Sequence, residues 1–295
     1  METRRGGIRT HGYRELTPRI LQVHKMHLGK YHGLGNDFLV ALSADNPHLE
    51  ADPAVARSLC DRHTGVGADG LIYALEPLDP ANDAQMVLLN SDGSRAEISG
   101  NGIRCMAQAL LAHAIRATPG SAPADSLAIE TDGGLRCVEL DAGDPISTIS
   151  LTVEMGEPRS GPPVSAAASA FGASHVATVD IGNPHLVLCV TDPDAVELSV
   201  EGPRLEADYP AGINVHFVSV DQAGEIDLRV WERGAGITLA CGSGAVAAAV
   251  AAHGWGLVER SVKVRMPGGV ARVGIADGSV RLTGPSTFVA TVTVP

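Results

Sequence analysis

Two stretches, "AEISGNGIRCMAQAL" at residues 96–110 and "TLACGSGAVAAAVAA" at residues 238–252, follow one pattern and decide the fold. Each places a short apolar run before a Gly-x-Gly corner and continues into an alanine-rich segment of helical character. Ser99 precedes the first corner and Cys241 precedes the second. This internal echo predicts two similar α/β halves, each of which contributes one strand–corner–helix element to a shared cleft. Two unrelated glycine-rich turns are the alternative interpretation.

The echo extends upstream of both corners. "GND" at 35–37 leads into the apolar "FLVAL", and "GNP" at 182–184 leads into "HLVLCV". Asn90 and Glu232 each lie nine residues before the corner residue (99 − 90 and 241 − 232). Each coincidence is weak alone, but together they favour duplication of a whole α/β unit.

Composition and charge exclude several classes of protein. The 295 residues are 44% hydrophobic and 19% charged, which is typical of a soluble globular chain, and no apolar run approaches the about 20 residues of a membrane-spanning helix. The formal net charge is −12, but residues 1–25 hold six Lys or Arg against two Glu, a balance of +4, so the rest carries −12 − 4 = −16. So acidic a body repels phosphate backbones, and we expect no nucleic-acid partner.

Residues 1–25 and the cysteines together favour a reducing compartment. Residues 1–25 lack the apolar stretch of a secretory signal and fit an organelle transit peptide only loosely. A flexible tail, or sequence upstream of a true start at Met26, is the simplest interpretation. The five cysteines are an odd number without a C-x-x-C pair, which argues against a disulfide framework and against structural zinc. We expect a cytoplasmic protein without a metal.

Two sequence features that could indicate a cofactor lack the context that a cofactor site requires. "GVGADG" at 65–70 matches G-x-G-x-x-G, but a helical pattern precedes it and a strand pattern follows it, the reverse of a dinucleotide site. A pyridoxal phosphate site needs a lysine, and Lys25, Lys30 and Lys263 stand in no site-like context. The sequence therefore predicts chemistry without a cofactor.

Cys241 is the candidate for a reactive group. A thiol at a helix N-terminus is stabilised as the anion by the helix dipole and by free backbone N–H groups, which predicts a pKa lowered toward neutrality. The alternative is a buried inert cysteine. Glu232 and Arg233, in "VWERGAG", end a predicted strand, where arginine can clamp a carboxylate and glutamate can act on a thiol or an amine. A surface ion pair is the alternative for these two.

The order of the motifs along the chain resembles that of a known family. "KYHGLGNDF", "DRHTGVGADG", "NSDGSRAE" with "SGNGIRC", "IGNPH", "GINVHFV", "ERGAGITLACGSGA" and "MPGG" follow in the order seen in diaminopimelate epimerases, from about Met26 to the C-terminus. The resemblance implies an α/β fold of two pseudo-symmetric halves, each a mainly antiparallel sheet or barrel around a central helix, with the active site in the cleft between them. It also implies cofactor- and metal-independent interconversion of LL- and meso-diaminopimelate, in which one cysteine takes the Cα proton and a second returns a proton to the other face.

The resemblance also assigns boundaries and roles. It divides the chain into a basic, flexible N-terminal extension at 1–25, halves at 26–145 and 146–285, and a closing strand at 286–295 that returns to the N-terminal half. Cys241 matches the second cysteine. The asparagines that hold the two amino-acid ends of the substrate are Asn36, Asn90, Asn183 and Asn214. The residues that grip the reacting carboxylate through backbone N–H groups are Gly100, Asn101, Gly242 and Ser243.

Three further positions match residues around the substrate and the thiol. Arg233 matches the residue that binds the distal carboxylate, and Glu232 the one that binds the reacting amine and influences the thiol. His185 matches a histidine that adjusts a cysteine. The expected partner is a small amino acid, and the family suggests a homodimer.

Ser99 departs from the family, which has cysteine at this position. A hydroxyl is far more basic than a thiol and is almost never ionised near neutrality, so Ser99 is expected to donate or relay a proton better than it abstracts one. Three explanations stay open: a natural variant that still epimerises, an introduced Cys→Ser change that leaves a catalytically impaired, substrate-binding form, or a one-thiol lyase or isomerase acting on a related amino acid. A binding protein without catalysis is the non-enzymatic alternative. Gly70 and Ile237 are smaller departures, which we expect to alter the fit of the distal end of the substrate.

Overall fold

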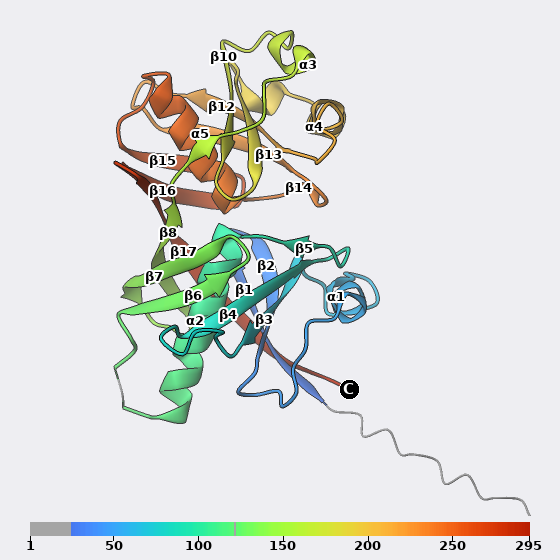
Figure 1. The fold of residues 1–295 in the computed structure, drawn as a ribbon, viewed down its shortest axis with the longest axis vertical. Coiled ribbons are helices and arrows are strands. Elements are labelled where there is room, and N and C mark those ends of the chain that lie inside the picture. Colours follow the sequence, from blue (N-terminus) through green and yellow to red (C-terminus); the bar gives the residue numbers. More distant parts are fainter. Residues whose placement is uncertain (1–24, 121) are drawn as a thin grey trace, which may run out of the picture.

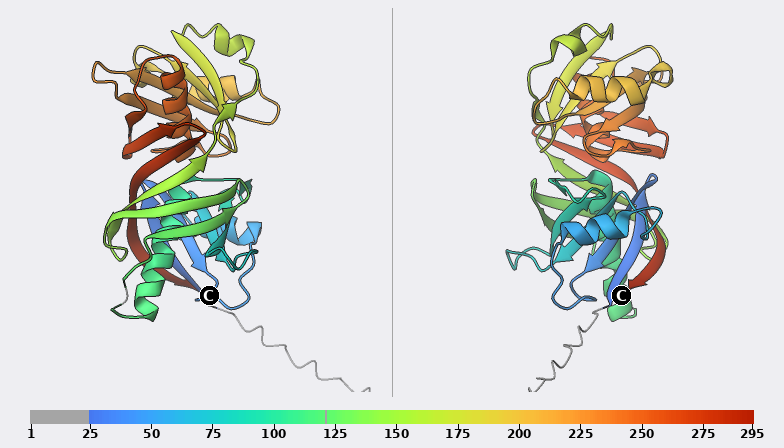
Figure 2. Two further views of the ribbon diagram at one scale, coloured as in Figure 1. Left: turned by 60° about the vertical axis from the view of Figure 1, so that its left-hand side comes forward. Right: turned by 90° about the vertical axis from the view of Figure 1, so that its right-hand side faces the viewer.

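The computed structural model describes residues 25–120 and 122–295, and it shows two barrel-like halves stacked along the long axis (Figures 1 and 2). The predicted extension at 1–25 lies outside the described residues, apart from Lys25. The elements of the N-terminal half are β1 (Met26–Gly33), β2 (Asn36–Leu42), α1 (Pro53–Cys60), β3 (Gly70–Leu75), β4 (Ala84–Asn90), β5 (Arg95–Ala96), α2 (Gly100–Ala117), β6 (Ser126–Thr131), β7 (Gly134–Gly143) and β8 (Thr148–Gly156). The elements of the C-terminal half are β9 (Arg159–Ser160), α3 (Ala166–Ser169), β10 (His175–Asp180), β11 (Pro184–Cys189), η1 (Pro193–Ala195), α4 (Leu198–Glu206), β12 (Asn214–Val220), β13 (Ile226–Glu232), β14 (Gly236–Ile237), α5 (Gly242–Gly254), β15 (Ser261–Met266), β16 (Gly269–Ala276) and β17 (Ser279–Val294).

Strand pairing closes the N-terminal half into a barrel. β1 pairs with β2 and β17, β2 runs parallel to β3, and β4 runs parallel to β6. β3 pairs with β4, β6 with β7, β7 with β8, and β8 with β17, which completes the ring. Helix α2 contacts strands on all sides of this ring, so it forms the central helix.

The C-terminal half repeats the same pairing order. β10–β11 and β12–β13 are antiparallel, β11–β12 and β13–β15 are parallel, and β15–β16 and β16–β17 are antiparallel. Helix α5 contacts all seven of these strands and corresponds to α2. The predicted fold class, two pseudo-symmetric α/β halves each built around a central helix, is confirmed by this correspondence.

The composition of the central helices follows from their enclosure. A helix surrounded by strands must be apolar on every face, and α5 is built from alanine, valine and glycine, with Ala245 to Ala249 fully buried. In α2 the fully buried Arg104 and Gln108 interrupt the apolar surface. Gln108 Nε2 donates to the carbonyl of Pro145 at 3.0 Å and its Oε1 accepts from Ser286 at 2.6 Å, so the amide is satisfied inside the barrel.

Strand β17 joins the two halves. Its residues 279–283 pair with β16 of the C-terminal half, and residues 287–294 pair with β1 of the N-terminal half. β8 pairs with β7 and with β17, so residues 148–156 extend the N-terminal sheet past the predicted boundary at 145/146. In Figure 2 the red strand β17 runs along the molecule beside β8.

The repeated topology brings equivalent residues to the edge where the halves face each other. Asn36 opens β2 and Asn183 immediately precedes β11. The cross-strand partners Phe38–Gly70 and His185–Asn214 align β3 with β12. The equivalent residues at this edge are therefore Asn36 with Asn183, Gly70 with Asn214, Asn90 with Glu232, and Ser99 with Cys241.

Three structural observations concern the dinucleotide site, the membrane-spanning helix and the metal site that the sequence argues against. The G-x-G-x-x-G match at 65–70 leads into strand β3 and not into a helix, so it has the wrong order for a dinucleotide site. Among the residues that the structure describes, no helix is long and apolar enough to cross a membrane. The same residues contain no group of three or more His, Cys, Asp or Glu side chains arranged to hold a metal ion.

Candidate active site

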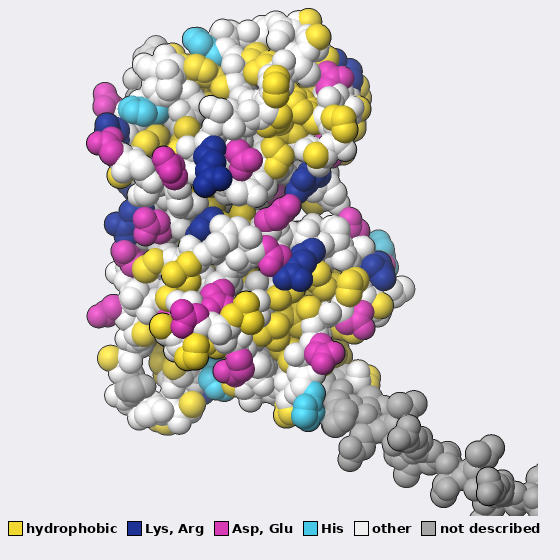
Figure 3. Space-filling view, in the orientation of Figure 1, with side chains coloured by type: hydrophobic (Ala, Val, Ile, Leu, Met, Phe, Trp, Pro, Cys, Tyr) yellow, Lys and Arg dark blue, Asp and Glu magenta, His cyan; other side chains and the backbone are white. Residues whose placement is uncertain are grey.

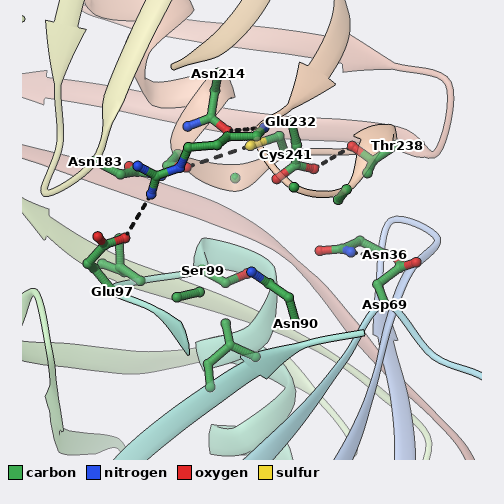
Figure 4. Close-up of a pocket in the computed structure, with 18 of the residues that line it drawn as sticks. Asn36, Asp69, Asn90, Glu97, Ser99, Asn183, Asn214, Glu232, Thr238 and Cys241 are labelled. Atoms are coloured by element: carbon green, nitrogen blue, oxygen red, sulfur yellow. Dashed lines mark hydrogen bonds and ion pairs between the residues drawn. The ribbon is translucent and has the colours of Figure 1, made fainter. Parts of the chain in front are cut away.

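A cavity of about 460 Å³ lies between the two halves, where both central helices begin (Figure 4). Both halves contribute to its walls. The predicted site residues that line it are Asn36, Asn90, Ser99, Gly100, Asn183, Asn214, Glu232, Arg233, Cys241, Gly242 and Ser243. Asn101 and His185 lie behind this surface.

Ser99 and Cys241 occupy matching positions, because each caps the N-terminus of a central helix. Ser99 has φ −140° and ψ 118°, and Cys241 has φ −126° and ψ 116°. Ser99 Oγ accepts a hydrogen bond from the amide of Gly102 at 3.0 Å, and Cys241 Sγ accepts one from the amide of Gly244 at 3.3 Å. The structure therefore presents a hydroxyl and a thiol to one cavity from two related corners.

The two helices begin against each other. A Cβ added at Gly242 would lie 2.9 Å from Cα of Gly100, which is closer than side chains normally approach backbone. The first amides of a helix have no partner within it and carry the positive end of the helix dipole. Two such N-termini that meet at one point form a site for a carboxylate and stabilise negative charge that develops on it.

Replacing Gly242 by alanine tests this close approach. The added methyl group meets the backbone of Gly100 and a methyl group of Leu282, so the helices must separate or strain. We expect a loss of about 1–3 kcal/mol in the free energy of unfolding, the usual cost of overpacking. Urea unfolding measures this loss. Gly254→Ala, at a position with no atom within 4 Å of the added Cβ, is the control, and equal behaviour of the two variants would contradict the argument.

Burial and a neighbouring carboxylate control the Cys241 thiol. Cys241 is 4% exposed, and its pKa is raised well above the ordinary value, first by burial and then by the charge of Glu232. Hydrogen bonds from Ser243 and from the amide of Gly244 act in the opposite direction but do not prevail. The expectation of a thiol pKa lowered toward neutrality is therefore wrong for the free protein. The helix dipole lowers the thiol pKa, but burial raises it by more, and burial cannot be seen in the local sequence.

Glu232 is the carboxylate beside the thiol. Burial raises the pKa of Glu232, while hydrogen bonds with Thr238 and Cys241 lower it. Thr238 Oγ1 donates to Glu232 Oε1 and fixes the carboxylate at the cavity (Figure 4). The titrations of the Glu232 carboxylate and the Cys241 thiol are therefore coupled.

Glu232→Gln tests the link to the thiol. Since the Glu232 charge raises the pKa of Cys241, its removal moves the thiol pKa toward the ordinary value. The pH at which a small alkylating reagent modifies half of Cys241 is therefore expected to fall. Mass spectrometry of the alkylated peptide between pH 6 and 11 measures this midpoint. A midpoint that stays in place or rises would contradict the coupling.

His185 is fully buried and does not line the cavity. Its Nε2 lies 2.8 Å from Oδ1 of Asn183, and its Nδ1 lies 2.7 Å from Nε2 of His216. Because an amide oxygen only accepts, His185 Nε2 donates to Asn183 and His216 Nε2 donates to His185. His216 in turn packs against Gly244 in the first turn of α5. Any effect of His185 on Cys241 therefore passes through Asn183 or through His216 and the helix.

The histidine pair predicts acid sensitivity. Burial lowers the pKa of His216 to about 3, below the 6.5 of an unfolded histidine, so below pH 6.5 the unfolded state binds more protons. The free energy of unfolding therefore falls as the pH falls from 6.5 toward 3. Between pH 6.5 and 5, His216→Gln is expected to make this slope shallower by about 1 kcal/mol per pH unit in urea titrations. The exposed His63→Gln is the control, and an unchanged slope in His216→Gln would refute the prediction.

Asn101 links the two halves through its side chain. Its Nδ2 donates to Asn36 Oδ1 and to the carbonyl of Ala240, both at 3.1 Å, and Ala240 directly precedes Cys241. Its Oδ1 accepts from Arg104 at 2.6 Å. Asn36 Nδ2 in turn donates to Asp69 Oδ2 at 2.7 Å, which extends this hydrogen-bond network to Asp69. The Asn101 side chain thus connects the two corners. The role predicted from the sequence concerns only its backbone amide, as a donor to the reacting carboxylate.

Several polar lining residues were not predicted from the sequence, among them Asp69, Glu97 and Thr238. Glu97 lies two residues before Ser99, and alternate residues of an extended segment share a face, so this spacing was a usable signal. The sequence signal for Thr238 is limited to its position three residues before Cys241. For Asp69 it is limited to the position directly before Gly70. Neither spacing indicates a role without the fold.

Figure 4 shows Ser99 and Cys241 at the same cavity, and each of them caps the N-terminus of a central helix. This arrangement defines a class, the isomerases that invert a carbon next to a carboxylate. Solved structures share the fold: a hydroxyproline epimerase from Agrobacterium vitis with bound trans-4-hydroxy-L-proline has a TM-score of 0.68 and 20% sequence identity, and covers 92% of this chain and 91% of its own. A predicted epimerase from Pseudomonas aeruginosa also has a TM-score of 0.68, with 19% identity over 91% of this chain and 99% of its own.

The sequence comparisons define the family. The diaminopimelate epimerase family model matches residues 28–160 and 177–289. The diaminopimelate epimerase of Rhizorhabdus wittichii is 42% identical over 284 residues, covering 92% of this chain and 94% of the relative. That of Desulfitobacterium hafniense is 40% identical over 282 residues, covering 90% and 96%. The chain belongs to the diaminopimelate epimerase family and is an isomerase.

Proposed function

We propose that this chain interconverts LL- and meso-2,6-diaminopimelate by moving a proton at Cα, without a cofactor or a metal, in lysine and peptidoglycan precursor synthesis. The observation that carries the proposal is the pair Ser99 and Cys241, which cap two abutting helices with the same backbone geometry and face one cavity. Family membership supports the substrate.

Proton transfer follows from the positions of these groups. Glu232 accepts the Cys241 thiol proton, and the thiolate then takes the Cα proton. The electron pair left on Cα delocalises into the carboxylate, whose developing charge is stabilised by the amides at the starts of α2 and α5. The Ser99 hydroxyl gives its proton to the opposite face of Cα, and water protonates the Ser99 oxyanion that remains. Glu232 then releases the proton it accepted to the hydroxide so formed, while Cys241 keeps the former Cα proton as its thiol proton. The sequence of steps inverts Cα and restores every group.

The rest of the cavity suits the distal end of the substrate. Arg233 is assigned the distal carboxylate, and Glu232 is assigned the reacting amine in addition to the thiol. Asn214 is held in place, since its Oδ1 accepts from the Arg233 amide and its Nδ2 donates to the Pro184 carbonyl, both at 3.0 Å. With Asn90 and Asn183 it supplies the neutral polar contacts that orient an amino acid.

A second candidate, a one-thiol lyase or isomerase on a related amino acid, has one observation in its favour. Within the described residues, Ser99 Oγ accepts a hydrogen bond from the backbone amide of Gly102, and no titratable side chain bonds to this hydroxyl. A hydroxyl without a base is a weak proton acceptor. A catalytically impaired form that binds substrate rests on the same observation.

The cellular setting is part of the proposal. A net charge of −12 opposes binding to nucleic acid or to anionic membranes, and a free thiol at the centre of the chemistry suits the reducing cytoplasm. A homodimer follows from the family resemblance alone, and light scattering on the purified chain tests it.

Conversion of LL-diaminopimelate by the purified chain tests the function. Chiral chromatography is expected to show meso-diaminopimelate appearing until both isomers coexist at equilibrium, and Cys241→Ala is expected to show none. Formation of ammonia or an alkene instead would support the lyase. Tight binding without conversion would support the impaired form, and neither binding nor conversion would refute the diaminopimelate assignment.

A further inference from the structure

The cleft holds an ion pair that joins the two halves away from the reacting groups. Arg233 NH2 of the C-terminal half lies 3.2 Å from Glu97 Oε2 of the N-terminal half. In Figure 4 the carboxylate of Glu97 faces across the cavity toward the side that carries Asn183, and Figure 3 shows acidic and basic side chains gathered along the waist of the molecule. Neither partner is fully buried: the side chains are 47% exposed for Glu97 and 31% for Arg233, so a ligand in the cavity can reach both.

Both members of the pair are held in place by the fold. The carbonyl of Glu97 accepts from the amide of Gly133 at 3.1 Å, and the next residue, Ile98, is buried. Arg233 NH1 donates to the carbonyl of Ala211 at 3.1 Å. The backbone of Glu97 and the guanidinium of Arg233 are thus each held by a hydrogen bond, and the two charges face each other at the cavity.

We propose that Glu97 and Arg233 together form the subsite for the non-reacting amino-acid end of the substrate, with its carboxylate on Arg233 and its ammonium on Glu97. This inference rests on the proposed function and adds a residue with no assigned role. A guanidinium has five N–H donors, and its hydrogen bonds to Ala211 and Glu97 within the described chain leave donors for a carboxylate. A carboxylate that entered alone would lie beside the negative charge of Glu97, whereas a group that also carries an ammonium satisfies both.

The other carboxylates of the cavity have different partners. Glu232 is engaged with Thr238 and the thiol at the reacting end. Asp69 accepts from the Asn36 amide at 2.7 Å, and Asp92 accepts from Ser94. Glu97 is therefore the carboxylate that meets the distal end beside Arg233, and the pair selects amino acids with a second zwitterionic head over those that end in a plain carboxylate.

Calorimetric binding of two ligands to Glu97→Gln tests the proposal. The ligands are LL-diaminopimelate and 2-aminopimelate, which is the same chain without the distal amino group. We expect the natural chain to prefer diaminopimelate, and we expect this preference, the ratio of the two Kd values, to fall by about tenfold in Glu97→Gln, because one charge-assisted hydrogen bond is lost. Glu139→Gln is the matched control, since Glu139 also pairs with an arginine, is 49% exposed and lies outside the cavity, and its ratio is expected to stay unchanged.

Binding separates this inference from the proposed function, because it does not require turnover. A fall in affinity for both ligands by the same factor would overturn the ammonium subsite and leave Glu97 a structural partner of Arg233. An unchanged ratio would overturn it as well. If the natural chain binds diaminopimelate without converting it, the proposed function fails while the subsite is still decided by the ratio. If it binds neither ligand, both proposals fail.

Discussion

Cys241→Ser is expected to slow Cα proton exchange with diaminopimelate by about 10³–10⁴-fold. The Cys241 thiol caps a central helix at the cavity and is hydrogen-bonded to Glu232, the carboxylate proposed to deprotonate it. A hydroxyl in the same place is a much weaker acid, so the Glu232–Cys241 proton exchange no longer yields a usable base, and general-base contributions reach this magnitude. NMR of the Cα proton in D₂O measures the rate directly.

Cys137→Ser is the control for a general effect of losing a thiol, because Cys137 lies on β7 away from the cavity. Its exchange rate is expected to match that of the natural chain. Exchange that survives in Cys241→Ser at more than about a tenth of the natural rate would refute the assignment of Cys241 as the base.

Ser99→Cys is expected to raise kcat/KM for epimerisation by about 10²-fold or more, and by the same factor in both directions. When Ser99 donates its proton to Cα it must pass through an oxyanion, and the reverse reaction crosses the same transition state. A thiol at this helix N-terminus lowers that barrier from both sides, because the thiolate is far more accessible than the oxyanion. Initial rates from LL- and from meso-diaminopimelate measure the two directions.

Ser99→Ala completes this test. It removes the proton donor and keeps the helix and the Cys241 corner, so inversion is expected to fall further while binding persists. If Ser99→Ala inverts as fast as the natural chain, water alone serves that face and Ser99 has no part in the chemistry. If Ser99→Cys gains nothing, the departure at this position does not limit the reaction.

Much of this architecture could be predicted from the sequence, because the duplicated strand–corner–helix pattern is local. The residues before and after each corner indicated a strand, a tight turn and a helix without any knowledge of contacts. The pairing of Ser99 with Cys241 and of Asn90 with Glu232 followed from equal spacing, and the strand register of the two halves agrees with it.

What the sequence did not predict depends on contacts between distant residues. "GP" at 284–285 looks like a break, yet β17 is one strand that passes from one barrel to the other there. His216 meets His185 only because β11 and β12 run side by side. The direction of the Cys241 pKa shift was wrong for the same reason, since burial and the charge of Glu232 come from the fold and outweigh the helix N-terminus.

Simultaneous measurement of configuration and isotope at Cα tests the central claim most directly. The natural chain is incubated in D₂O with each diaminopimelate isomer, and the product is separated by chirality and analysed by NMR. Two groups on opposite faces predict an inverted centre that carries one solvent deuterium, since the proton that Ser99 delivers comes from the solvent while Cys241 keeps the one it took. Deuterium at a centre of retained configuration, without inversion, would show that Cys241 works alone and would contradict the account.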